Sequence, residues 1–185
     1  MRILALALAT SLASASPVAV QAQATTATTT SSSAPALTVD AFARQAAQNS
    51  LTEVLLSAMA LQKSDDKRVD DHAWTMLDHH SRAMGDLADA LSAEAAPLPA
   101  EPSAEQTATL ERMRGLDGAE FDTAYFTHQV EAHGAAIRLF EQAGDLSGDD
   151  ERIADYARVT LPVLEAHLEI AQYRQNQEPQ PVVAQ

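Results

Sequence analysis

The chain has 185 residues, enough for one domain with a sizeable core, and its low aromatic content of 4% together with many alanine, leucine, glutamate and glutamine residues favours helix over sheet. Its formal net charge of -14 repels phosphate backbones and anionic lipid headgroups, so we expect no nucleic-acid partner. The absence of cysteine excludes disulfides, thiolate metal sites and a cysteine nucleophile.

Residues 1–24 have the pattern of a secretory signal peptide. Arg2 precedes an apolar run, and the small-residue pattern Ala22-Gln23-Ala24 fits cleavage after either alanine. The run is short and interrupted by Ser and Thr, which argues against a membrane-spanning helix, and no later segment is long enough for one. We therefore expect an exported, periplasmic protein without a transmembrane segment, and leave peripheral association with the outer membrane open.

Two segments lack the apolar content needed to fold. Residues 25–37, TTATTTSSSAPAL, form a low-complexity tether, and residues 176–185 form a polar tail with two prolines. We expect both to be disordered. The folded domain should then span residues 38–175.

Within this domain, apolar residues recur with helical period in four long stretches, each preceded by a capping residue. The predicted helices cover about residues 39–63, 67–92, 118–144 and 149–175. Thr38 is the expected N-cap of the first helix, the acidic turn Ser64-Asp65-Asp66 should cap the second, and Asp117-x-x-Glu120 should cap the third. Pro162 should kink the fourth. Between the second and third lies a proline-rich segment followed by a capping box, Ser103-x-x-Gln106, which starts a short helix ending near residue 114.

Two short connections and one of about 24 residues indicate two helical hairpins. The long connection, with its short extra helix, can cross the length of a helix of about 40 Å. The sequence therefore predicts an all-α fold, and we favour a ferritin-like four-helix bundle over simple up-and-down order.

Three histidines fall on inward faces near the midpoints of their helices: His80, His133 and His167. Because each lies near the midpoint of its helix, the three histidines come to similar heights in a bundle whichever way the helices run. Glu53 lies near the midpoint of the first helix, at the edge of its apolar face. Three imidazoles and a carboxylate could hold a divalent metal such as zinc, copper or iron. Asp122, Tyr125 and Gln129 share the inner face of the third long helix and are candidate partners for these side chains.

A structural role is the first interpretation of these histidines, because helical phase alone is imprecise and core polar groups can satisfy neutral imidazoles. For Glu53, exposure to water and burial as a ligand are equally compatible with its position. The Glu-x-x-His pattern of di-iron bundles is absent, since Glu131 is two residues from His133 and Glu165 two from His167, which sends the paired side chains to opposite sides. His72, His79 and His128 are expected at the boundary of the core.

Four segments resemble the family called domain of unknown function 4142: LTEVLLSAMALQK (51–63), MLDHHSRAMGDLADAL (76–91), FDTAYFTHQVEAHGAAIRLFEQA (121–143) and TLPVLEAHLEIAQ (160–172). The resemblance implies an exported bacterial ferritin-like bundle, sometimes labelled an outer-membrane protein, and it matches His80, His133 and His167 to the family's histidines. Its Asp-His pairs are changed here, because His79 and Ala132 stand where the family has an acid. The resemblance implies no established activity.

We therefore favour a non-enzymatic periplasmic bundle in envelope or stress physiology, in which the interior histidines are structural residues and candidate ligands of a divalent metal. The alternative is a ferritin-like metalloenzyme that acts on oxygen species or on metal redox. The metal content of protein purified without an affinity tag separates the two, since a metal-free protein excludes the enzyme.

Overall fold

The computed structural model describes residues 36–91, 95–146 and 151–180. In these ranges it contains five α-helices and no strand, which confirms the all-α prediction. They are α1 (Val39–Lys63), α2 (Lys67–Ala90), α3 (Ala104–Arg114), α4 (Gly118–Gly144) and α5 (Glu151–Gln175). The predicted signal peptide and most of the predicted tether lie outside the described residues.

Capping residues fix most helix starts where the sequence predicts them. The Thr38 hydroxyl accepts from the Ala41 amide at 3.2 Å, and the Asp66 carboxylate accepts from the Arg68 amide at 2.8 Å. Ser103 and Gln106 form the reciprocal capping box at the start of α3. Each bond satisfies an amide that the first turn of a helix leaves free, which stabilises a helix end by about 1 kcal/mol.

The predicted N-cap of α4 is confirmed in position, but the predicted capping bond is absent. Asp117 occupies the N-cap position but makes no side-chain capping bond, and its carboxylate instead pairs with the Lys63 ammonium at 2.8 Å. The next residue, Gly118, has a φ of 52°, a left-handed conformation that glycine adopts without steric cost. The start of α4 is therefore set by a glycine turn and a contact with the end of α1.

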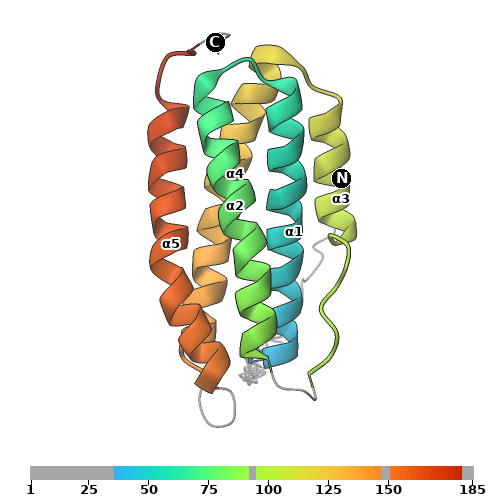
Figure 1. The fold of residues 1–185 in the computed structure, drawn as a ribbon, viewed down its shortest axis with the longest axis vertical. Helices are drawn as coiled ribbons and strands as arrows, with labels where there is room; N and C mark the ends of the chain where they lie inside the picture. Colours follow the sequence, from blue (N-terminus) through green and yellow to red (C-terminus); the bar gives the residue numbers. More distant parts are fainter. Residues whose placement is uncertain (1–35, 92–94, 147–150, 181–185) are drawn as a thin grey trace, which may run out of the picture. The chain divides into compact units, whose positions relative to one another are not determined.

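The four long helices lie side by side as two hairpins (Figure 1). Helix α1 packs along α2 and α4 along α5, and the hairpins meet where α2 contacts α5 and α1 contacts α4. Helix α3 lies on the outside against α1 and α4. Its docking is helped by a hydrogen bond of 2.8 Å from Gln106 Nε2 to Asn49 Oδ1 of α1.

The core is divided along the helices into two apolar clusters with a polar layer between them. The first apolar cluster joins the start of α1, the end of α2, the second half of α4 and the first half of α5. It comprises Phe42, Ala43, Ala46, Ala47, Leu87, Ala136, Phe140, Ala143, Ile153, Ala157 and Leu164. The second joins the end of α1, the start of α2, part of α3 and the first half of α4, and comprises Leu56, Ala60, Val69, Ala73, Leu110, Met113, Phe121, Tyr125 and Phe126. The buried polar residues between them, which we call the histidine layer, are Ser50, Glu53, His80, Gln129, His133 and His167.

The end of α5 is fastened to the start of α2. The buried Arg68 guanidinium bonds the Asp66 carboxylate at 2.6 Å and donates to the carbonyls of Arg174, at 3.0 Å, and Gln177. The Gln180 amide donates to Asp66 Oδ1 at 3.2 Å. The part of the predicted disordered tail that the structure describes, residues 176–180, thus makes specific contacts, whereas residues 181–185 lie outside the described residues.

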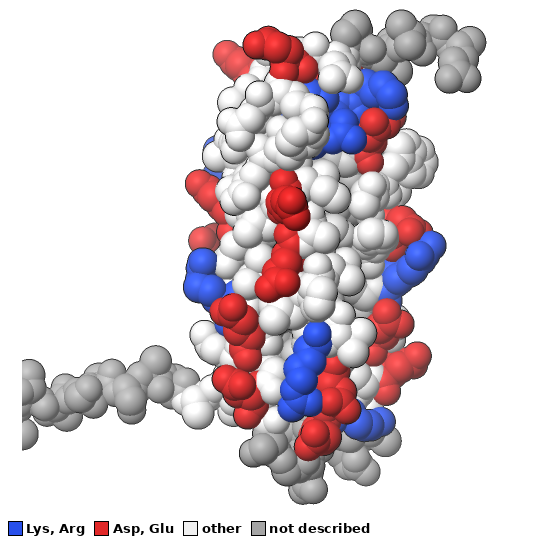
Figure 2. All heavy atoms as spheres, turned by 90° about the vertical axis from the view of Figure 1, so that its left-hand side faces the viewer, with Lys and Arg blue, Asp and Glu red and all other residues white. Residues whose placement is uncertain are grey.

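The surface over α5 is mixed in charge. Figure 2 shows this side of the molecule, on which basic side chains stand beside acidic ones rather than as a continuous basic area. Several large apolar side chains of α2 and α5 are exposed, among them Trp74, Val159 and Tyr173. Among the helices that the structure describes, none combines the length and hydropathy required to cross a bilayer.

Candidate metal centre

His80 of α2, His133 of α4 and His167 of α5 meet in the histidine layer. Each offers a ring nitrogen, and these three atoms lie within 4.8 Å of one another. The ring centroids are 5.2 to 5.6 Å apart, and all three side chains are buried, with exposures of 6%, 2% and 2%. The convergence that helical phase and height suggested is therefore present in the structure.

Within the described residues, each ring has one nitrogen without a hydrogen-bond partner. His133 Nδ1 lies 2.9 Å from the Gln129 carbonyl oxygen, and because a carbonyl only accepts, Nδ1 carries a proton; in the neutral ring Nε2 then has the lone pair. His80 Nε2 is likewise unpartnered, while its Nδ1 is 3.5 Å from Ser50 Oγ. In His167 it is Nδ1 that has no partner among the described residues.

Buried polar atoms are nearly always bonded, and leaving one unbonded costs about 1–3 kcal/mol. Three such nitrogens on three adjoining rings form an arrangement that a protein core would not keep for stability. Imidazole nitrogens are good ligands for zinc, copper and iron, so the residues present fit a divalent transition metal.

Electrostatics keeps two of these imidazoles neutral. Burial lowers the pKa of His80 to about 4, and burial together with the nearby His133, His80 and His79 lowers the pKa of His167 to about 2. Near pH 7 both rings therefore retain the lone pairs that a metal needs, because protons compete weakly for them.

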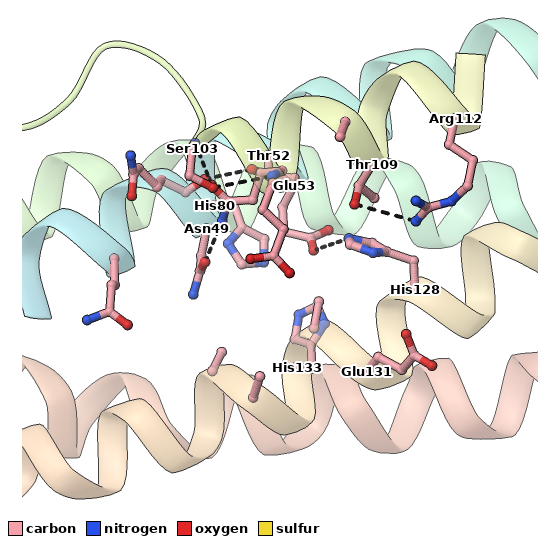
Figure 3. Close-up of a pocket in the computed structure, with 18 residues that line it drawn as sticks. Asn49, Thr52, Glu53, His80, Ser103, Thr109, Arg112, His128, Glu131 and His133 are labelled. Carbon is pink, nitrogen blue, oxygen red and sulfur yellow. Dashed lines mark hydrogen bonds and ion pairs between the residues drawn. The ribbon is translucent and has the colours of Figure 1, made fainter. Parts of the chain in front are cut away.

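Glu53 adds a buried carboxylate to the layer. Its Oε2 accepts from Gln129 Nε2 at 2.6 Å, and its Oε1 lies 3.6 Å from His128 Nε2. Burial by itself raises the pKa of this carboxyl, but the contact with His128 and the proximity of His133 and His80 outweigh it, so the pKa is well below its usual range. Figure 3 shows the carboxylate between the rings of His80, His128 and His133. Glu53 is ionised, yet it is not among the residues whose ligand atoms lie within 4.8 Å of one another.

A cleft of about 740 Å³ leads from the surface to this layer between α1, α3 and α4. Glu53, His80 and His133 form part of its wall, and Arg112 and Glu131 also line it (Figure 3). A second cavity, of about 40 Å³, reaches His80 and His167 from the side of α2 and α5. The cleft gives small polar solutes a route to two of the three clustered histidines.

Of the three predicted partner residues, the structure brings only Gln129 to the histidines. Tyr125 instead bonds His72 Nδ1 through its hydroxyl at 2.9 Å, and the polar neighbours of Asp122 are Ser64, Asp66 and Arg68. These two residues share the inward phase of His133 but precede it by 8 and 11 residues, which places them about 12 and 16 Å away along the helix axis. Helical phase correctly predicted that Asp122 and Tyr125 face the interior. Their positions along the helix axis, however, place them too far from the histidines to be partners.

The boundary prediction for the other histidines was wrong for His72. This side chain is only 2% exposed, and its ring packs edge-on against Tyr125 and Phe126 with centroids 5.6 Å away in both cases. The spacing of His72 from the buried Arg68 and Met76, four residues in each direction, is the signal that could have revealed it. His128 is partly buried and His79 exposed, as expected for boundary positions.

Comparison with known proteins supplies a family and a fold. The sequence pattern described as "Domain of unknown function (DUF4142)" matches residues 21–173. A solved structure, of the "putative secreted protein DUF305 from Streptomyces coelicolor", is 19% identical, with a TM-score of 0.58, and the alignment covers 76% of this chain and 96% of that one. At this identity the likeness concerns the fold alone. No curated protein matches the chain.

Proposed function

The chain belongs to the DUF4142 family, and we propose that its mature domain is an exported, ferritin-like four-helix bundle that binds one divalent transition metal through His80, His133 and His167. One observation carries the proposal: three buried imidazoles from three helices meet with one unpartnered ring nitrogen each. Zinc, copper and iron all suit such a ligand set.

The remaining groups of the layer suit this role. Three neutral imidazoles leave the charge of a divalent ion uncompensated, and the ionised Glu53 lies beside His80 and His133 to offset it. Glu53 or a water molecule would complete a tetrahedral coordination sphere. The Gln129 carbonyl holds the His133 ring by its Nδ1, as acceptors behind ligand histidines commonly do.

The test is metal content and affinity in protein made without a histidine tag. We expect about one metal per chain by mass spectrometry, and His133→Gln and His167→Gln should each lower zinc or copper affinity at least about 100-fold, since second-shell losses alone reach that range. His72→Gln is the matched control, because it removes a buried histidine of the same core whose Nδ1 bonds Tyr125 outside the cluster, and it should change the affinity by less than about tenfold. Wild-type protein that binds no metal, or a control as damaging as His133→Gln, would refute the metal site.

A second candidate is a metalloenzyme that acts on oxygen species or on metal redox. The cleft of about 740 Å³ favours it, because three protein ligands leave one coordination position open and the cleft reaches two of them, His80 and His133. Metal-loaded wild-type protein should then consume hydrogen peroxide or superoxide, and His133→Gln should not. Metal binding without either activity supports the non-enzymatic function.

Export is supported by the signal-like sequence of residues 1–24 and by the description of the DUF305 protein as secreted. We expect the protein expressed with its full sequence to appear in the periplasmic fraction, with a mature mass that distinguishes cleavage after Ala22 from cleavage after Ala24. Recovery with washed outer membranes would place it in peripheral association with the envelope instead.

A further inference from the structure

His79 is the one residue bonded to a ring nitrogen of His167 among the described residues. His79 Nδ1 lies 2.7 Å from His167 Nε2, and the two rings stack with centroids 5.0 Å apart and planes at 18°. His167 is buried, whereas His79 is exposed on α2. The pair therefore joins the interior cluster to the surface through a single hydrogen bond.

Between two neutral imidazoles, the direction of this bond decides which nitrogen of His167 is free. If His167 Nε2–H donates to His79 Nδ1, then His167 Nδ1 carries a lone pair. If His79 donates instead, the proton of His167 sits on Nδ1, which is buried and has no acceptor in the part of the chain that the structure describes. Buried N–H groups without an acceptor are rarer than under-satisfied acceptors, so the first direction is favoured.

We propose that His79 is a positioning residue that accepts a hydrogen bond from His167 Nε2–H and so keeps a lone pair on His167 Nδ1, the ring nitrogen that has no partner among the described residues. His133 is held in the same way with its nitrogens exchanged: the Gln129 carbonyl accepts from Nδ1 and leaves Nε2 free. Two of the three clustered histidines thus each have their own acceptor. The consequence for metal rests on the proposed function, but the tautomer itself does not.

Two substitutions separate the hydrogen bond from the packing. In aspartate, Oδ1 is bonded to Cγ as Nδ1 is in histidine, so His79→Asp retains an acceptor at that place and offers no donor at neutral pH. His79→Phe retains a flat ring that can stack on His167 but supplies no acceptor. His79 is exposed, so neither change should unfold the protein.

The first experiment reads the tautomer of His167 in metal-free protein by the nitrogen chemical shifts of labelled histidine at pH 8. We expect His167 to be protonated on Nε2 in wild type and in His79→Asp, and to become a mixture or shift to Nδ1 in His79→Phe. Protonation on Nδ1 in the wild type, or an unchanged tautomer in His79→Phe, overturns the inference whether or not the protein binds a metal.

The second experiment measures zinc affinity of the same three proteins by chelator competition. We expect His79→Phe to bind zinc about 10- to 100-fold more weakly, the usual cost of losing an outer-shell partner, and His79→Asp to bind at least as tightly as wild type. An altered tautomer with unchanged zinc affinity overturns the positioning role. A wild type that binds no zinc refutes the proposed metal site, while the tautomer measurement still decides the direction of the bond.

Discussion

The first apolar cluster and the histidine layer are packed alike but differ in whether their buried polar groups have hydrogen-bond partners. In the cluster, the rings of Phe42 and Phe140 meet edge to face at 5.0 Å, and the neighbouring Tyr156 donates its hydroxyl to the Ala83 carbonyl at 3.1 Å. In the layer, the imidazoles of His80, His133 and His167 are just as close and as deeply buried, yet each keeps a nitrogen unbonded. Burial is therefore common to both regions, and only the layer keeps free lone pairs.

The difference assigns separate roles to the two regions. Apolar burial and aromatic contacts drive folding, whereas unbonded polar groups oppose it. A core that keeps three of them at mid-height, reached by a cleft and flanked by a charged carboxylate, has the pattern expected if stability is given up for the proposed metal binding. Substitutions in the two regions should therefore affect different measurements.

The largest effect on stability is expected from Phe42→Ala in the first apolar cluster. Phe42 is fully buried and touches Phe140 and Tyr156, so the cavity should lower the free energy of unfolding by about 3–5 kcal/mol. Metal affinity should change by less than about threefold, because Phe42 precedes Glu53 by 11 residues, about 16 Å along α1. Urea unfolding of metal-free protein and a zinc titration check both halves. An affinity loss as large as that of His133→Gln would show that the regions are not separate.

Part of the pH dependence of stability should come from the layer, and part from His72, because burial lowers its pKa to about 4 as well. The pKa of His80 is about 4 in the folded state and 6.5 in the unfolded chain. Between these two pH values the unfolded chain therefore binds a proton on this imidazole that the folded protein does not. Stability from this group is thus complete above pH 6.5 and is lost as pH falls, by about 2 kcal/mol between pH 6.5 and 5.

This pH dependence can be tested by urea unfolding of metal-free protein at several pH values between 7.5 and 5. His80→Gln cannot gain a proton, so it should flatten the curve by about that amount. Phe42→Ala should lower the whole curve without changing its slope. Equal slopes for wild type and His80→Gln would contradict the prediction.

The sequence predicted the parts of the fold that local chemistry decides. The start of α1 at Thr38, that of α2 at Asp66 and the capping box of α3 depend on side chains bonding backbone within three residues. The start of α4 failed this rule because a glycine turn and a distant lysine, Lys63, replace the local bond.

The candidate site was predictable only in part for the same reason. The three histidines near the helix midpoints meet because matching phase and height suffice for convergence. The burial of Glu53, the bond from His79 to His167 and the cleft beside α3 depend on contacts between helices, such as that of Gln106 with Asn49. Periodicity along one helix carries no information about these contacts.

The smallest predicted effects are those of the same change, tyrosine to phenylalanine, at two positions. Tyr156→Phe removes a hydroxyl from the Ala83 carbonyl, which as a helix carbonyl also accepts a backbone N–H, so we expect a loss of about 0.5–1.5 kcal/mol. Tyr125→Phe removes the partner of His72 Nδ1 at 2.9 Å, and His72 Nε2 is already unpartnered, so the imidazole would be buried without any bond. That should cost about 1–3 kcal/mol. Urea unfolding at pH 8, where the imidazole is neutral in both folded and unfolded chains, measures both variants. A larger loss for Tyr156→Phe than for Tyr125→Phe would show that a buried imidazole left without a hydrogen bond does not weaken this fold more than a lost tyrosine hydroxyl does.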